Sequence, residues 1–192
     1  MLANVVERVA SAVGRERVVV ATSIDVSDDA VAAHARELKV ACFRGSLEDV
    51  YGRMRACLEA HPAPWFFRVS ADSPLLDPAI LKALLPLAVP GIDLVTNVFP
   101  RTFPAGQSAE LINADAFRRV DAAALTPSQR EHVTTVFYEN PGRWRIVNLE
   151  SGRLERGAPL TVDAPEDLAR LEAAYPAGEP LPSWAPSVRS AA

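Results

Sequence analysis

The sequence lacks any apolar run long enough to cross a membrane, and it lacks any cluster of basic residues. No stretch approaches the ~20 apolar residues that a transmembrane helix requires, and the charges among the first residues are unlike a signal peptide. The formal net charge at pH 7 is −4, which argues against nucleic acids and anionic membranes as partners. An anionic nucleotide stays a candidate ligand, because a metal ion and a few local arginines can bind it.

Cysteine is scarce, and several catalytic and phosphate-binding motifs are absent. The two cysteines, Cys42 and Cys57, have no metal-ligand spacing, so we expect reduced thiols in a cytoplasmic protein. No serine, threonine or cysteine lies in a nucleophile motif, and neither G-x-G-x-x-G nor G-x-x-x-x-G-K-[ST] occurs. The sequence therefore gives no support for covalent catalysis or for either glycine-rich phosphate loop.

The length and composition are those of one globular domain. The chain has 192 residues, of which 49% are hydrophobic and 23% charged, enough to bury a substantial core. We expect a folded domain over residues 1–176. Residues 177–192, rich in proline and small side chains, are expected to form a flexible tail.

Predicted strands alternate with predicted helices along the chain. β-Branched and aromatic runs indicate strands, and apolar residues at helical spacing after capping residues such as Ser27, Ser46 and Asp77 indicate helices. The expected strands are 18–21, 40–43, 65–69, 92–96, 111–112 and 144–149, and the expected helices are 2–13, 27–38, 46–61, 77–85, 115–123, 127–140 and 165–175. This order predicts a three-layer α/β fold with a mixed, mostly parallel sheet, in which the aromatic strand 65–69 is central.

The candidate site lies where the strands end, since doubly wound sheets bind ligands at the carboxyl ends of their strands. Asp72 directly follows strand 65–69, and Asp163 follows a β-type pair and precedes a proline. Two carboxylates in such settings can bind one Mg²⁺. The alternatives are that Asp72 caps the turn before Pro74 and that Asp163 is the N-cap of the last helix.

Other polar residues have weaker signals. Arg44 and Arg53 flank Ser46 and could face a phosphate or a base, although solvated surface arginines would look the same. His132 lies near a helix start, where it is either catalytic or, more simply, packed or hydrogen-bonded. Asp77 precedes Pro78 and is expected to be an N-cap.

Taken in order, several segments resemble one known family. They are Val18-Val-Val-Ala-Thr-Ser23, Phe43-Arg-Gly-Ser46 with Asp49-Val50 and Gly52-Arg53, Asp72-Ser-Pro-Leu-Leu-Asp-Pro78, Asn97 with Pro100-Arg-Thr-Phe-Pro104, Arg130-Glu-His-Val133, and Leu160-Thr-Val-Asp-Ala-Pro-Glu-Asp-Leu168. Over residues 1–175 the chain resembles the cytidylyltransferases of the spore coat polysaccharide biosynthesis type, which are related to CMP-Kdo and CMP-sialate synthetases.

The resemblance implies a nucleotidyltransferase fold of the glycosyltransferase-A kind and Mg²⁺-dependent attack by a sugar or sugar acid on the α-phosphate of CTP. It implies that Asp72 and Asp163 bind the Mg²⁺ and are the catalytic acids. The nucleotide-binding residues expected here are Ala21, Thr22, Ser23 and Arg53, and those facing the sugar, and often a partner subunit, are Arg101, Glu110 and His132.

The sequence departs from this family in three places. The family's first strand and its Gly/Arg/Lys-rich nucleotide loop would precede Met1, Ala71 replaces a glycine, and Ala105-Gly-Gln-Ser108 replaces an Asp-Gly-x-Asp stretch. We therefore expect an open slot in the sheet beside residues 18–21. Two other readings stay open, a degenerate relative that acts as a binding module and a metal-dependent glycosyltransferase.

A homodimer is a further expectation. The segment Val98-Phe-Pro-Arg-Thr-Phe103 carries two aromatic residues and is too rich in proline for a central strand. It is predicted to be a contact arm.

Overall fold

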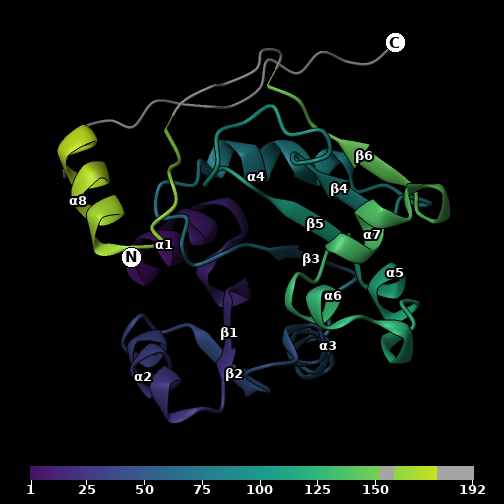
Figure 1. Cartoon of the computed structure of the whole chain (residues 1–192), viewed down its shortest axis with the longest axis horizontal. Helices are drawn as coiled ribbons and strands as arrows, with labels where there is room; N and C mark the ends of the chain where they lie inside the picture. Colours follow the sequence, from purple (N-terminus) through teal and green to yellow (C-terminus); the bar gives the residue numbers. More distant parts are fainter. Residues whose placement is uncertain (152–157, 177–192) are drawn as a thin grey trace.

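The structure, a computed structural model, describes residues 1–151 and 158–176; the predicted tail 177–192 lies outside them. Helices and strands alternate along the chain, as the sequence predicts (Figure 1). In chain order the elements are α1 (Leu2–Val13), β1 (Val19–Ser23), α2 (Asp29–Glu37), β2 (Ala41–Gly45), α3 (Val50–Ala60), β3 (Trp65–Arg68), α4 (Pro78–Leu84), β4 (Leu94–Thr96), β5 (Glu110–Asn113), α5 (Ala114–Arg118), α6 (Pro127–Glu131), α7 (Thr135–Glu139), β6 (Ile146–Asn148) and α8 (Pro165–Ala174), with short 3-10 turns between some of them.

The strands form two sheets within the described residues. β1 and β2 pair in parallel, and the second sheet has the order β3-β5-β4-β6. In the second sheet β4 and β6 are parallel, whereas β5 is antiparallel to both β3 and β4. The predicted mixed α/β fold is confirmed, but the single sheet that we expected is divided in two.

The division lies between β1 and β3, and it leaves one edge of each strand open. β1 pairs only with β2, and β3 pairs only with β5, among the strands of residues 1–151 and 158–176. The expected open slot beside residues 18–21 is therefore confirmed. The central position predicted for strand 65–69 is wrong, because β3 lies at one edge of its sheet. Aromatic residues indicate that a strand packs against helices, but they do not indicate how many strands pair with it.

Helices cover both faces of the four-stranded sheet. On one face α1 and α4 pack against Trp65, Phe67, Val95, Leu111 and Val147. On the other, α3, α5 and α7 pack against Phe66, Leu94, Ile112 and Ile146. Side chains of neighbouring positions thus alternate between two cores, as a pleated strand requires, and the predicted three layers are confirmed.

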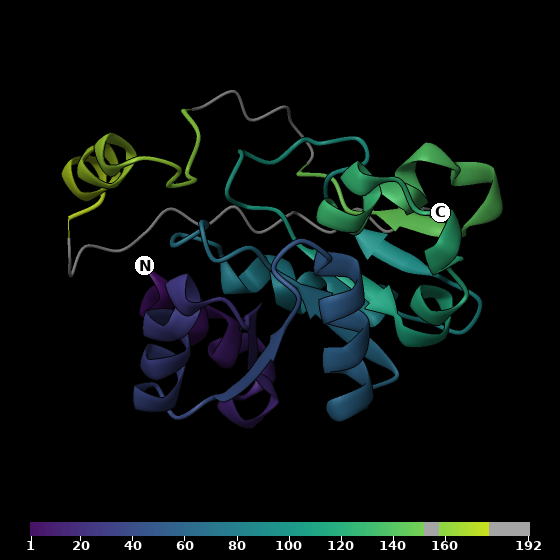
Figure 2. The same cartoon turned by 60° about the horizontal axis from the view of Figure 1, so that its bottom comes forward.

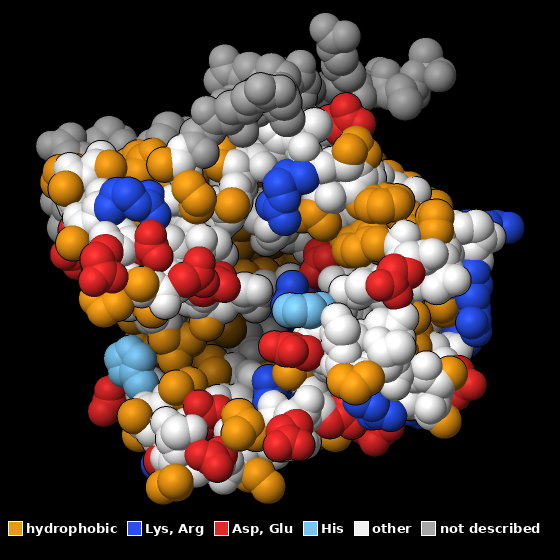
Figure 3. All heavy atoms as spheres, in the orientation of Figure 1, with side chains coloured by type: hydrophobic (Ala, Val, Ile, Leu, Met, Phe, Trp, Pro, Cys, Tyr) orange, Lys and Arg blue, Asp and Glu red, His pale blue; other side chains and the backbone are white. Residues whose placement is uncertain are grey.

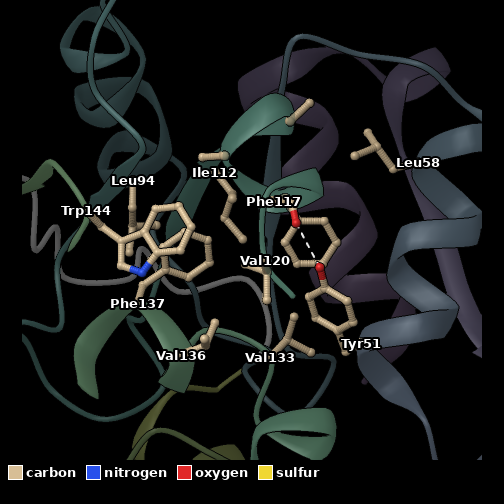
Figure 4. Packing of buried hydrophobic residues seen from close by; sticks show 12 residues of the cluster. Tyr51, Leu58, Leu94, Ile112, Phe117, Val120, Val133, Val136, Phe137 and Trp144 are labelled. Atoms are coloured by element: carbon tan, nitrogen blue, oxygen red, sulfur yellow. Dashed lines mark hydrogen bonds between the residues drawn. The ribbon is translucent and has the colours of Figure 1, made fainter. Parts of the chain in front are cut away.

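The hydrophobic core that packs against α3 contains a buried hydrogen bond. The Tyr51 hydroxyl donates a 2.7 Å hydrogen bond to the Phe117 carbonyl, and the two rings lie 4.6 Å apart (Figure 4). Trp144 packs on Phe137 in the same cluster. These contacts join α3, α5 and α7 beneath the sheet.

Several element boundaries differ from expectation because other side chains make the caps. Asp25 and Asp49, rather than Ser27 and Ser46, accept the capping N–H bonds at the starts of their helical segments. The single helix predicted over 127–140 is interrupted at His132, which has φ −98° and ψ 72°, so that α6 and α7 are separate. Local apolar spacing does not report such a break.

The last described helix, α8, lies at the margin of the molecule (Figures 1 and 2). It is anchored by a small cluster in which Leu171 packs with Leu160, Val162 and Leu75. In the part of the chain that the structure describes, no helix has the length and apolar character to cross a membrane.

Candidate functional site

Asp72 and Asp163 come from adjacent backbone segments. The Val162 N–H donates a 2.9 Å hydrogen bond to the Asp72 carbonyl, which joins the loop after β3 to the segment before α8. The Asp72 side chain is partly exposed and the Asp163 side chain is exposed. The structure thus brings together the segments that carry both predicted metal-binding acids. Their shared Mg²⁺ stays a prediction.

Neither the Asp72 nor the Asp163 carboxylate caps a helix. Ala164, not Asp163, is the N-cap of α8, and Asp167 accepts hydrogen bonds from both the Asp163 and Ala164 N–H groups. Asp163 as a plain N-cap is therefore wrong. Asp72 Oδ1 accepts a 2.8 Å bond from the Ser73 hydroxyl. Asp77, in contrast, is the N-cap that the sequence predicts, accepting from the Ala79 N–H at 2.8 Å.

A buried amide holds the neighbouring loop in place. Gln107 is fully buried; its Oε1 accepts from the Asp77 N–H and its Nε2 donates to the Leu75 carbonyl, both at 2.8 Å. The Asn97 amide donates to the Gln107 carbonyl at 2.7 Å. One glutamine thus ties the loop after β3 to residues that follow β4. From the sequence, this stretch was noted only because Ala105 and Ser108 stand where the family has acids. Gln107 between them was not singled out, although an amide can satisfy a donor and an acceptor at once.

The end of β1 is closed by Asp28. Its Oδ2 accepts 2.8 Å bonds from the Thr22 hydroxyl and the Ser23 N–H. These hydrogen bonds from Ser23 and Thr22 lower the pKa of Asp28 to about 2. Because both groups are engaged with Asp28, a nucleotide contact by Thr22 or Ser23, which stays a prediction, would compete with this carboxylate.

The two arginines near Ser46 differ in role. Arg44 donates to the Ser23 carbonyl at 2.7 Å and to the Asp25 carbonyl at 2.8 Å, and pairs with Asp29 at 2.7 Å. Arg44 therefore stabilises the end of β1, a structural role that neither interpretation of Arg44 from the sequence predicted. Arg53 donates through Nη1 to the Ser46 carbonyl at 2.6 Å, while its buried Nε has no hydrogen-bond partner among the described residues. Because this Nε atom is buried, it does not by itself support a nucleotide contact, and the nucleotide-binding role of Arg53 stays a prediction.

The three residues expected to face the sugar do not share one environment. Glu110 is 3% exposed, and its oxygens accept bonds from Arg68 at 3.2 Å and from the Tyr138 hydroxyl at 2.6 Å. Burial and the Glu110 charge raise the pKa of Tyr138 well above its usual range. Arg101 and His132 are exposed. The sugar-binding role of all three residues stays a prediction. Glu110 differs from the other two because it is buried and its carboxylate accepts hydrogen bonds from the protein.

The predicted contact arm is only partly exposed. Phe103 is 1% exposed and belongs to the core, whereas Phe99 is 39% exposed and stacks on Tyr138 at 5.0 Å. Only Phe99 of the two aromatic residues is available to a partner.

Helices on both faces of a mixed sheet, with two acids on adjacent backbone segments, are compatible with the nucleotidyltransferase class. The family model described as cytidylyltransferase matches residues 1–172. The chain therefore belongs to the cytidylyltransferase family of nucleotidyltransferases, which confirms the resemblance seen in the sequence.

Individual relatives agree with this assignment. The spore coat polysaccharide biosynthesis protein SpsF of Bacillus subtilis is 30% identical over 164 residues, which cover 84% of this chain and 68% of that protein. An uncharacterized protein of Methanocaldococcus jannaschii is 30% identical over 170 residues, covering 87% and 69%.

Solved structures confirm the fold. A cytidylyltransferase from Leptospira borgpetersenii superposes with a TM-score of 0.84 at 28% identity, covering 89% of this chain and 73% of that one. CMP:2-keto-3-deoxy-manno-octonic acid synthetase complexed with CTP superposes with a TM-score of 0.66 at 16% identity, covering 90% and 86%. The latter likeness is evidence for the fold alone.

Proposed function

We propose that this protein transfers CMP from CTP to a sugar or sugar acid for surface polysaccharide synthesis, with Mg²⁺ as cofactor, in the cytoplasm. The observation that carries the proposal is the hydrogen bond between Val162 and Asp72, which sets Asp163 beside the loop of Asp72. The cytidylyltransferase family supports CTP as a substrate, and a relative named for spore coat polysaccharide biosynthesis supports the polysaccharide part of the proposal. The free thiols of Cys42 and Cys57 support a reducing compartment.

The donor chemistry of the two acids suits a magnesium ion. Among the described residues, Asp72 keeps one carboxylate oxygen beyond the Ser73 contact, and the exposed Asp163 accepts a long 3.3 Å contact from Thr161. Mg²⁺ prefers such a site, with one or two carboxylates and phosphate oxygens. When bound, it would offset negative charge on the transferring phosphate. Asp72 and Asp163 would hold it, and the Arg53 guanidinium would donate to the nucleotide.

The magnesium assignment is tested by removing each acid. Asp72→Asn and Asp163→Asn are each expected to weaken the Mg²⁺-dependent part of CTP binding by about tenfold, the loss of one charge-assisted contact. Ligand-observed NMR of CTP, with Mg²⁺ or with EDTA, measures the effect. Glu166→Gln removes an equal charge three residues from Asp163, on an exposed side chain, and is the matched control.

Equal effects of all three substitutions would contradict a specific metal site. If the protein bound neither CTP nor another nucleoside triphosphate, the hypothesis of a degenerate relative that acts as a binding module would be favoured.

We also propose a homodimer that forms through Phe99. Because this ring is 39% exposed and rests on Tyr138, it offers a rigid apolar contact. Light scattering is expected to give about twice the 20.7 kDa chain mass, and Phe99→Glu is expected to return the protein to the monomer. Val89→Glu, at a side chain that is 48% exposed elsewhere, is the control. A monomeric mass for the unmodified protein at high concentration would refute the dimer.

A further inference from the structure

The side chain of Gln107 is bonded to the loop that carries Asp72. Its Oε1 accepts from the Asp77 N–H and its Nε2 donates to the Leu75 carbonyl, both at 2.8 Å. Leu75 lies three residues after Asp72. Gln107 is fully buried, so water cannot replace either bond when the amide is removed. The amide therefore fixes loop 72–77 against a buried part of the chain.

The backbone next to Gln107 is bonded to the segment that carries Asp163. The Ala105 carbonyl accepts a 2.8 Å hydrogen bond from the Leu160 N–H, three residues before Asp163. Gly106 approaches the same segment so closely that an added Cβ would lie 2.6 Å from the Leu160 carbonyl carbon. Three consecutive residues thus contact both of the segments that carry the acids.

The two acid-carrying segments are also bonded to each other, which closes a ring of hydrogen bonds. The Val162 N–H donates to the Asp72 carbonyl at 2.9 Å, and Leu75 packs with Leu160 and Val162 in one apolar cluster. In the space-filling view of Figure 3, a hollow lined by hydrophobic side chains separates the region of α8 from that of α2. The position of Asp163, just before α8, therefore depends on the ring more than on packing of α8 against α2.

Asn97 anchors this ring to the four-stranded sheet. Its Nδ2 donates to the Gln107 carbonyl at 2.7 Å, and its Oδ1 accepts from the Ala109 N–H at 2.9 Å. Asn97 directly follows β4 and is fully buried. Because buried, hydrogen-bonded polar networks make a structure rigid, Gln107 is a fixed point relative to the sheet.

We infer that Gln107 is a positioning residue, which sets the separation of the Asp72 and Asp163 carboxylates without contacting the metal or the nucleotide. An amide suits this role because it accepts from one backbone group and donates to another, whereas a carboxylate would repel the Leu75 carbonyl. As far as Mg²⁺ is concerned, this inference rests on the proposed function. The effect of Gln107 on the backbone does not.

Hydrogen exchange tests the positioning without any nucleotide. Gln107→Met keeps the length of the side chain but removes both polar groups. We expect the Val162 amide proton to exchange at least about tenfold faster, because loop 72–77 is released from its fixed point. The amide of Ala114, which is bonded to Pro64 at the other end of β5, reports on the rest of the sheet and should change less. Equal changes at the two amides overturn the inference.

A milder variant serves if Gln107→Met does not fold. Gln107→Asn keeps an amide that is too short to reach both Leu75 and Asp77. The Val162 amide proton is expected to exchange faster in this variant too, by a smaller factor than in Gln107→Met. No change at Val162 in a folded Gln107→Asn protein would equally contradict the inference.

The role in metal binding is tested by coupling to Asp72. Gln107→Met is expected to weaken the Mg²⁺-dependent part of CTP binding by about tenfold, as the loss of one charge-assisted contact would. In the Asp72→Asn background the same substitution should add little, because the acid through which Gln107 acts is already neutral. Losses that multiply in the double variant overturn the inference, since a merely structural defect acts equally in both backgrounds.

Tyr51→Phe is the matched control. It removes a buried 2.7 Å hydrogen bond from the core on the other face of the sheet, and it should leave Mg²⁺-dependent CTP binding unchanged. A loss equal to that of Gln107→Met contradicts the inference. If the unmodified protein binds no CTP with Mg²⁺, the proposed function fails, and the exchange rates of Val162 and Ala114 alone decide whether Gln107 positions the loop.

Discussion

Replacement of Glu110 by alanine is expected to lower the free energy of unfolding by about 3 kcal/mol, since breaking a buried, hydrogen-bonded ion pair costs roughly 3–5 kcal/mol and the partial exposure of Arg68 reduces that figure. Glu110 holds both Arg68 of β3 and Tyr138 of α7. Tyr138 in turn supports Phe99, so one buried carboxylate links the sheet, a covering helix and the segment with Arg101. Urea denaturation measures the effect.

Two further variants separate the charge from the rest of the side chain. Glu110→Gln keeps the volume and an acceptor for Tyr138, and is expected to cost about half as much, on the order of 1–2 kcal/mol. Glu131→Ala, at an exposed position of α6, is the matched control and should stay within about 0.5 kcal/mol of the unmodified protein. A Glu110→Ala variant as stable as the Glu131→Ala variant would show that this network does not hold the fold.

Periodicity and capping residues in the sequence located most helices and strands, because these signals are local. Examples are Asp77 as an N-cap and the strand predicted over 18–21, which the structure has at Val19–Ser23. The order of strands in the sheets was harder to predict, because strand pairing joins residues far apart in sequence. Nothing in the residues Trp65–Arg68 indicates that β3 pairs with β5 and not with β1. The open edge of β1 was predicted only through the resemblance to the family.

For the site, the sequence singled out the acids but not the groups that hold their segments. Asp72 and Asp163 were predicted from their setting after strands, and their segments do meet. The links through Gln107 and Arg44 could not be predicted, because an amide or a guanidinium has no spacing that reveals which distant carbonyl it will bind. Such side chains fix the geometry of a site without appearing in a motif.

Substitution of Gly106 by alanine is expected to affect both stability and the site. Gly106 has φ 90°, and an added Cβ would lie 2.6 Å from the Leu160 carbonyl carbon. A non-glycine residue in a sparsely populated conformation costs roughly 1–3 kcal/mol, and the overlap with backbone adds to this, so we expect a loss of about 3 kcal/mol. Leu160 is bound to Ala105 through its N–H at 2.8 Å, so it cannot move without loosening that bond.

The displacement should reach the two acids. Leu160 lies two residues before Val162, whose N–H holds the Asp72 carbonyl, so moving Leu160 pulls the Asp163 segment away from Asp72. At a temperature where the variant is still folded, Gly106→Ala should therefore weaken Mg²⁺-dependent CTP binding by about as much as Asp72→Asn, roughly tenfold. Gly142→Ala is the matched control, because no atom lies within 4 Å of its added Cβ and its φ is not positive. If Gly106→Ala unfolds at the same urea concentration as Gly142→Ala and binds CTP equally well, the close approach of Gly106 to Leu160 does not position the acids.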